Sequence, residues 1–206
     1  MQASGKLTLD LISSAEAHTL PGLFLRRCEK TPEAEAYRQY EPAAGAWRSY
    51  RWREMRALAG RWRAALAREN LAPGERVAIL LRNSVEWVCF DQAAQSLGLA
   101  VVPLYVTDNP ENIAYILRDS DASALLLGNS EQWQALAPLR ARFPRLARVL
   151  CLERTATAVA GAGIELSFVA DWLAAEAEPM SAGDIDAHSL ATIVYTSGTT
   201  GRPKGV

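Results

Sequence analysis

The chain has 206 residues, half of them hydrophobic, and a formal net charge of −1. This length permits one large or two small domains with a substantial buried core. The composition is that of an ordinary soluble globular protein, and the near-neutral charge gives no indication of nucleic-acid binding.

A helix and a β-hairpin are expected at the start of the chain. Residues Leu20–Lys30 have an amphipathic helical pattern, and Thr31-Pro32 favours an end to that helix before the proline. Two aromatic-rich segments, Ala36–Tyr40 and Trp47–Trp52, are separated by turn-forming residues 41–45. They predict the two strands of the hairpin.

A second amphipathic helix is expected directly after the hairpin. Its apolar stripe recurs at helical spacing and comprises Trp52, Met55, Leu58, Ala59, Trp62 and Leu66. The arginines between Arg48 and Arg68 could suggest contact with nucleic acid or an anionic membrane, but Glu54 and Glu69 interrupt them. We interpret them as the solvated face of the helix, and we assign the tryptophans, including Trp87 and Trp133, to core packing.

From residue 77 onward, short apolar runs alternate with helical segments, which is the pattern of a buried parallel sheet with crossover helices. The five runs are Val77–Leu81, Leu99–Leu104, Ala122–Leu127, Arg148–Leu152 and Ala191–Tyr195. We therefore predict one α/β unit with a mainly parallel sheet and flanking helices, preceded by the helix and hairpin. Residues 156–163 are rich in small side chains and predict a surface loop.

Two helix starts can be predicted from capping residues. Asn83 followed by Glu86 can form a capping box, and the helix it opens would run through Phe90 and Leu97. Asn109-Pro110-Glu111 offers a cap, a first-turn proline and an early acid. Helices after Leu127 and Leu152 are expected from the alternation, although their patterns are less regular.

The most informative segment is residues 195–206, YTSGTTGRPKGV, which follows the last apolar run. Gly198 and Gly201 permit positive φ values, so backbone N–H groups can converge on an anion. Lys204 adds a mobile positive charge suited to polyphosphate, and the hydroxyl groups available are those of Thr196, Ser197, Thr199 and Thr200. These features favour a phosphate-binding loop.

The spacing of this loop differs from the Walker loop, because only two residues separate the glycines and Arg202-Pro203 precedes the lysine. The loop instead resembles that of the adenylate-forming enzymes, which include acyl-CoA synthetases, peptide synthetase adenylation domains and luciferases. Residues 71–81 and 83–87 resemble early segments of the same family, and Val102–Leu117 resembles bacterial long-chain fatty acid:CoA ligases in particular.

The resemblance implies a fold, a reaction and a set of ligands. Such enzymes join a carboxylate, here expected to be a fatty acid, to ATP, release pyrophosphate and pass the acyl group to the thiol of coenzyme A. The resemblance assigns the β- and γ-phosphates of ATP to Thr196, Ser197, Gly198, Thr199, Thr200, Gly201 and Lys204. It also makes Thr199 the candidate Mg²⁺ ligand, with Mg²⁺ bridging the phosphate oxygens.

No catalytic residue is expected within these 206 residues, because the family's acyl-adenylate-forming lysine lies near the C-terminus of the full enzyme. We expect the chain to be the truncated N-terminal portion of an AMP-binding domain, residues 1–206, and to be inactive as an acid-thiol ligase by itself. An adenylating ligase for another carboxylic acid and a noncatalytic binding or scaffold remnant stay open as alternatives. For the isolated chain, a glycine-rich turn without a ligand is also open.

The sequence further predicts where the protein resides and what it contacts. Residues 1–10 lack the features of a signal peptide, no apolar run is long enough to span a membrane, and Cys28, Cys89 and Cys151 show no metal or redox spacing. A cytoplasmic protein with free thiols is expected, and His18 and His188 are assigned no role. The full enzyme could touch a membrane peripherally, and the fragment could self-associate through an uncovered sheet face.

Overall fold

A five-stranded sheet in the order β4-β3-β5-β6-β7 forms the centre of the computed structural model, which describes residues 10–153, 164–173, 175–196 and 201–206. All neighbouring strands in this sheet run parallel. The strands are β3 (Arg76–Leu80), β4 (Ala100–Pro103), β5 (Ala122–Leu127), β6 (Arg148–Cys151) and β7 (Glu165–Phe168). The predicted α/β class with a mainly parallel sheet is therefore confirmed.

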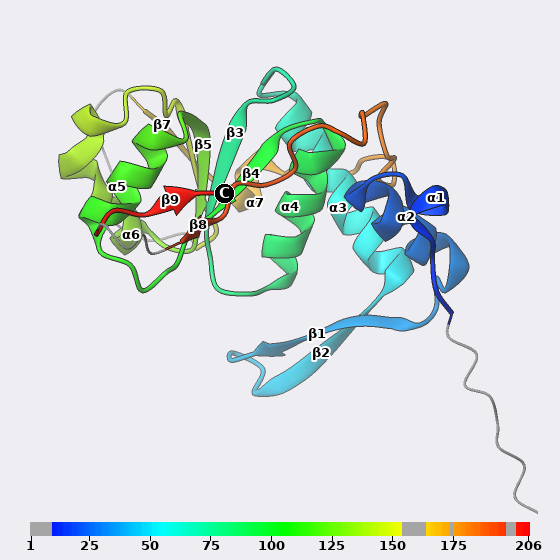
Figure 1. Ribbon diagram of the computed structural model, residues 1–206. Coiled ribbons are helices and arrows are strands. Elements are labelled where there is room, and N and C mark those ends of the chain that lie inside the picture. The colour runs from blue at the N-terminus through cyan, green and yellow to red at the C-terminus, as the bar shows by residue number, and fades with distance from the viewer. Residues whose placement is uncertain (1–9, 154–163, 174, 197–200) are drawn as a thin grey trace, which may run out of the picture.

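Helices cover both faces of the sheet, as Figure 1 shows. The core on one face is formed with α3 (Trp52–Ala67), α4 (Val85–Ser96) and α7 (Val169–Trp172), and α2 (Leu20–Lys30) adds to it by packing on α3 and α4. The other face packs against α5 (Pro110–Asp119), α6 (Ser130–Leu136) and the short 3₁₀ helix η1 (Ala137–Arg142). Successive strand residues alternate between the two cores, as Val77 and Ala78 do. The expected uncovered sheet face is wrong, because side chains on both faces are buried.

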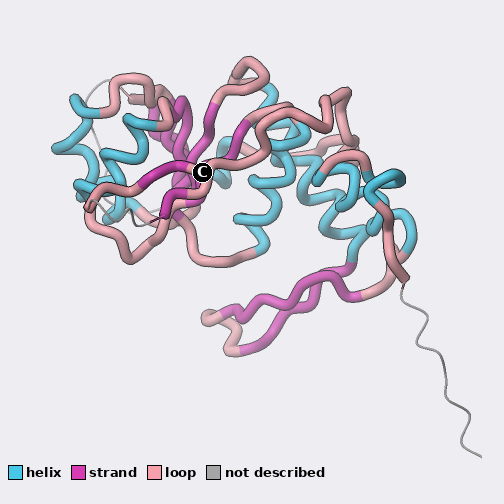
Figure 2. The backbone as a smooth tube through the Cα atoms, viewed as in Figure 1, coloured by secondary structure: helices cyan, strands magenta, loops and turns pink. Residues whose placement is uncertain are grey.

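The N-terminal helix and the hairpin follow the prediction closely. A short helix that the sequence pattern did not indicate, α1 (Ser14–Ala17), precedes α2. Strands β1 (Glu35–Glu41) and β2 (Ala46–Arg51) pair antiparallel, and the hairpin projects from the body of the molecule (Figures 1 and 2). Its tip carries the exposed Tyr40 and Trp47, whose rings meet edge to face at 5.6 Å.

Three predicted details are wrong. Helix α4 is capped by Ser84, whose hydroxyl accepts from the Trp87 N–H at 3.1 Å, and not by Asn83. The fifth strand of the sheet is β7 and not the run 191–195, which makes a single parallel bridge to β4. The helix expected after Leu152 is replaced by β7 and the one-turn α7, whereas α6 and the Asn109 cap of α5 are as predicted. The loop predicted at 156–163 lies outside the described residues.

The arginines of α3 join neighbouring segments instead of forming only a solvated face. Arg53 and Arg51 both pair with Glu33, at 2.5 and 2.8 Å. The Arg56 Nε donates to the Met180 carbonyl at 3.2 Å, and the Arg68 guanidinium donates to the Trp172 carbonyl. Most of this basic surface is therefore committed to the fold.

The predicted core assignments are confirmed for most residues. Trp62 and Trp133 are buried, while Trp52 and Trp87 are partly buried and pack against the first core. All three cysteines are buried and free, and burial raises the pKa of Cys28 to about 11. In the described part of the chain, no helix is long and apolar enough to cross a bilayer.

Asp91 is a buried acid on α4 that we expect to limit stability at neutral pH. Only 9% of the residue is exposed, and its carboxylate accepts from Gln95 at 2.7 Å and Gln92 at 3.0 Å. Burial raises the pKa of Asp91, and the two amide donors lower it. Because the folded pKa lies above the unfolded one, stability is greatest below the unfolded pKa and falls as pH rises.

Asp91→Asn is therefore expected to raise the free energy of unfolding at pH 7 by about 1 kcal/mol. The Gln92 amide must then turn over, so that its Oε1, which has no donor among the described residues, accepts from the new side-chain amide. At about pH 3 the gain should disappear, since the carboxyl is then largely neutral in both states. Urea unfolding at the two pH values measures this, with the exposed Asp184→Asn as control. A loss of stability at pH 7 contradicts the prediction.

Candidate functional site

The segment that leads into the loop runs beside the edge strand β4. The Val101 N–H donates to the Ala191 carbonyl and the Ile193 N–H donates to the Val101 carbonyl, both at 2.9 Å. The Thr192 hydroxyl donates to the same Val101 carbonyl at 2.9 Å. After Ile193 the chain leaves β4, and Ile193 and Tyr195 pack into the core on the α5 face. This change of direction explains why the run does not complete a sixth sheet strand.

The loop is closed at its base by a short antiparallel ladder. Val194 and Val206 exchange two backbone hydrogen bonds of 2.9 and 3.0 Å. Next to them, β8 (Tyr195–Thr196) pairs with β9 (Lys204–Gly205), so that Thr196 stands opposite Lys204. Gly201 has a φ of +85°, a value that a residue with a side chain rarely adopts. The two ends of the predicted loop are thus held together as a hairpin.

The structure describes part of the predicted site. Thr196 and Lys204 are exposed and face one another across the ladder, and Gly201 lies at the turn back toward Lys204. Ser197, Gly198, Thr199 and Thr200 lie outside the described residues. The hydroxyl of Thr196 and the ammonium group of Lys204 are therefore the predicted phosphate contacts that the fold brings to one place.

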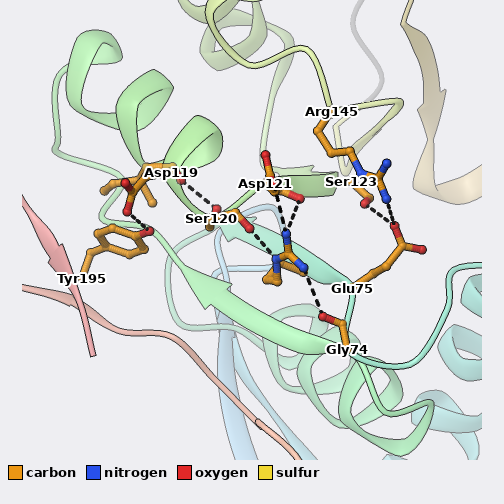
Figure 3. A network of polar contacts seen from close by, with 10 residues as sticks. Gly74, Glu75, Asp119, Ser120, Asp121, Ser123, Arg145 and Tyr195 are labelled. Carbon is orange, nitrogen blue, oxygen red and sulfur yellow. Dashed lines mark hydrogen bonds and ion pairs between the residues drawn. The ribbon is translucent and has the colours of Figure 1, made fainter.

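Helix α5 anchors both limbs of the loop, and Figure 3 shows the contact between Tyr195 and Asp119. The Tyr195 hydroxyl donates to the Asp119 Oδ2 at 2.7 Å. One turn earlier on the helix, the Tyr115 hydroxyl donates to the Asp119 Oδ1 at 3.4 Å, and the Arg202 guanidinium lies 5.8 Å from the centre of the Tyr115 ring. Burial, followed by the hydrogen bond to Asp119, raises the pKa of Tyr195. The phenol therefore stays protonated and remains a donor at neutral pH.

The end of α5 that carries Asp119 is held in place by a polar network (Figure 3). The Arg76 guanidinium donates to the Ser120 carbonyl and pairs with Asp121 at 3.6 Å. Beside it, Glu75 accepts from the Ser123 hydroxyl at 2.8 Å and from Arg145 at 2.9 Å. These contacts join the start of β3 to the turn between α5 and β5, so that Asp119 is presented from a rigid element.

The electrostatics of the loop suit an anionic ligand. Lys204 is exposed and makes no ion pair with a carboxylate among the described residues, so its charge is available. The nearby Asp119 carboxylate is occupied by two phenol donors. No three histidine, cysteine or acidic side chains converge on a possible metal site in the part of the chain that is described. The hydroxyl donors of the loop fit a hard cation such as Mg²⁺ only alongside phosphate oxygens.

The roles of three residues of the site could not be predicted from the sequence. Asp119 and Tyr115 are ordinary helix residues until the fold places them under the loop. At Gly205, near the end of the motif, a Cβ atom would lie 2.8 Å from the Ile193 Cγ2 and 3.1 Å from the Tyr195 Cζ. Only the pairing of Gly205 with Tyr195 in a tight ladder reveals this requirement.

Gly205→Ala is expected to separate the two limbs of the loop, because the new methyl group must push against the β-branched Ile193 and the buried Tyr195 ring. We expect a cost of about 1–3 kcal/mol, typical of overpacking, confined to the loop and its base. Hydrogen exchange of the Val194 and Val206 amides should increase with little change elsewhere. Gly45→Ala, in the turn of the β1–β2 hairpin, is the control for backbone strain elsewhere: its φ of +60° makes alanine costly, a Cβ atom there meets nothing within 4 Å, and exchange of the Val194 and Val206 amides should stay as in the wild type. Unchanged exchange in the Gly205 variant would contradict the prediction.

Comparison with known proteins places these features in a family. The family model described as "AMP-binding enzyme" matches residues 24–206. The chain is 32% identical over 195 residues to the long-chain-fatty-acid–CoA ligase FadD13 of Mycobacterium tuberculosis, covering 90% of this chain and 34% of that protein. It is also 32% identical over 196 residues to tyrocidine synthase 3 of Brevibacillus parabrevis, covering 95% of this chain and 3% of that protein.

A solved structure shares the fold. The anthranilate CoA ligase AuaEII in complex with anthranoyl-AMP superposes with a TM-score of 0.77 at 22% identity, covering 95% of this chain and 36% of that one. The chain thus spans about a third of the length of the CoA ligases it matches. With a family match over most of its residues and a relative above 30% identity, the chain belongs to the AMP-binding enzymes, the adenylate-forming ligase superfamily, and resembles their N-terminal part.

Proposed function

We propose that the full-length protein is an ATP-dependent fatty acid:CoA ligase and that residues 195–206 are its phosphate-binding loop. The observation that carries the proposal is the ladder that sets Thr196 opposite Lys204 at the mouth of a glycine-containing loop. The family match and the CoA ligases among the relatives support it. The domain assignment, residues 1–206 as the truncated N-terminal portion of the AMP-binding domain, is part of the same proposal.

In the first half-reaction, a carboxylate oxygen of the acid attacks the α-phosphorus of ATP, and the bond from that phosphorus to the bridging oxygen breaks. The electron pair leaves with pyrophosphate. Lys204 and the hydroxyl and N–H donors of the loop stabilise the negative charge that accumulates on this leaving group. In the second half-reaction, the CoA thiolate attacks the acyl carbonyl and AMP leaves. This chain's role is confined to the first step.

Mg²⁺ would neutralise phosphate charge at the loop, and Thr199 stays our predicted protein ligand for it. The described residues offer hydroxyl oxygens and no acidic cluster, so we expect any acidic partner of the metal to come from elsewhere in the full-length protein. Peripheral membrane contact stays a prediction, and self-association loses the uncovered sheet face on which it was based, because both faces are buried.

The most specific part of the proposal is the identity of the carboxylic acid substrate. The likeness of Val102–Leu117 to bacterial long-chain ligases favours a long-chain fatty acid, as does the FadD13 relative. Tyrocidine synthase 3 is equally similar in sequence identity, which supports an adenylating enzyme for another carboxylic acid as the second candidate. Val102 and Leu104 are buried in the sheet and its second core, so this segment can hold the fold in either case.

The test is acid-dependent formation of AMP and acyl-CoA by the purified full-length protein, with ATP, Mg²⁺, CoA and a panel of fatty, aromatic and amino acids. A preference of at least tenfold in kcat/KM for long-chain fatty acids supports the proposal. A preference for another acid establishes the second candidate. No AMP formation with any acid favours the noncatalytic remnant and overturns both.

A further inference from the structure

A small basic cavity adjoins the limb of the loop that returns to Lys204. Its volume is about 180 Å³, which is room for several waters of about 30 Å³ each and therefore for a phosphate group. Its walls come from α5, from η1 and from the loop, and the lining residues that matter are Arg118, Arg142, Arg202, Tyr115 and Glu111. Three arginines and one glutamate thus line one space.

The charges of these arginines are not neutralised by ion pairs among the described residues. None of the three pairs with a carboxylate among the described residues. Neighbouring Arg140 shows the contrast, because its guanidinium donates to the carbonyls of Phe143 and Leu146, each at 2.8 Å, and closes the turn after η1. Arg202 is oriented by the Tyr115 ring at 5.8 Å. Three positive charges are therefore available to a ligand in the cavity.

We propose that Arg118, Arg142 and Arg202 form a second anion site that binds a terminal phosphate group beside the phosphate loop. Planar guanidinium groups bind phosphate through paired N–H donors, and three of them around one cavity give the charge that a doubly ionised phosphate needs. Glu111 reduces but does not cancel that charge. This inference rests on the proposed function for its biological ligand, and on the cavity alone for its chemistry.

Two phosphate sources fit this position next to the loop. Pyrophosphate leaves the loop after adenylation and could pass through the cavity, while the other source is the 3′-phosphate of CoA. Both present a terminal phosphate group with two negative charges. The site differs from the loop in one testable respect, namely that Arg142 belongs to η1 and takes no part in the 195–206 hairpin.

The experiment titrates sodium pyrophosphate into the full-length protein by calorimetry at low ionic strength. We expect binding that Arg142→Gln weakens at least tenfold, with the melting temperature unchanged because this side chain is not buried. Arg38→Gln, the same change on the distant exposed hairpin strand β1, should leave the affinity unchanged. Wild-type affinity in the Arg142 variant, or loss only in Lys204→Gln, places the anion in the loop alone and overturns the proposal, as does absence of binding.

Titration of CoA against 3′-dephospho-CoA distinguishes the two sources. Tighter binding of CoA by tenfold, lost in Arg142→Gln, identifies the 3′-phosphate. Equal binding of both, together with Arg142-dependent pyrophosphate binding, identifies pyrophosphate. The ligase assay on the full-length protein is independent of these titrations. If that assay fails while Arg142-dependent binding persists, the anion site stands without the ligase function, and the converse result removes only the site.

Discussion

Replacing Lys204 by alanine in the full-length protein is expected to lower the rate of acid-dependent ATP–pyrophosphate exchange by a factor of about 100–1,000. The removal of one preorganised charge at the position where negative charge develops has effects of that size in enzymes. Lys204 is exposed, pairs with no described carboxylate and faces Thr196, so its ammonium group is free for a phosphate oxygen. The loss should appear mainly in kcat, because the charge on the leaving pyrophosphate grows in the transition state.

The control for this prediction is Lys30→Ala. Lys30 ends α2 and pairs with Asp10 at 3.3 Å, and among the described residues it forms no hydrogen bond or ion pair with the loop. Its replacement should change exchange less than twofold. Thermal unfolding of both variants should match the wild type, since neither ammonium group is buried. Exchange within threefold of wild type for Lys204→Ala would remove the lysine from the phosphate-binding role.

Replacing Glu69 by alanine is expected to lower the free energy of unfolding by about 3–5 kcal/mol, a large part of the total stability of a typical domain. The Glu69 carboxylate pairs with the Arg148 Nε at 2.7 Å and accepts from the Trp172 Nε1 at 2.6 Å. The Glu69 and Arg148 side chains are only 11% and 20% exposed. Truncation therefore removes the carboxylate from the mostly buried Arg148 guanidinium, which keeps its hydrogen bond to the Ser167 hydroxyl at 3.2 Å, and removes the acceptor of the buried Trp172 indole N–H.

Urea unfolding at neutral pH measures this effect, and two variants define its origin. Glu33→Ala removes a carboxylate whose arginine partners on the surface are more than half exposed, so its cost should stay below about 1 kcal/mol. The double variant Glu69→Leu with Arg148→Met should recover much of the loss, since it buries neither charge. A cost below about 1 kcal/mol for Glu69→Ala would show that solvent screens the pair.

Much of the fold could be predicted because its signals are local. The boundaries of α2 and β5 agree with the prediction to the residue, and those of β3, β4 and β6 to within one residue at each end. Helical spacing and apolar runs indicate which side chains are buried on folding, and both can be identified from neighbouring residues alone. The cap of α4 is predicted one residue too early. Asn83 and Ser84 are adjacent and both are good caps, so the local pattern does not distinguish between them.

The edges of the sheet could not be predicted, because they depend on contacts between segments that are distant in sequence. Glu165–Phe168 has a weak pattern and becomes a strand because β6 offers it a free edge. The apolar run at 191–195 has a strong pattern, yet it bridges β4 only once before the α5 core takes up Ile193 and Tyr195. Competition between two burial sites is decided by the whole structure and leaves no mark on the run itself.

The sequence by itself determined the α/β class, most of its helices and strands, and a loop whose glycines, hydroxyls and lysine suit phosphate, because each of these follows from residue type and short spacing. The tertiary structure alone decided how that loop is held. Asp119 and Tyr115 meet Tyr195 and Arg202 across a separation of more than seventy residues, and Gly205 is required only because the ladder brings Ile193 against it. Such contacts depend on how distant segments pack together, and residue types and short spacings do not reveal which segments meet.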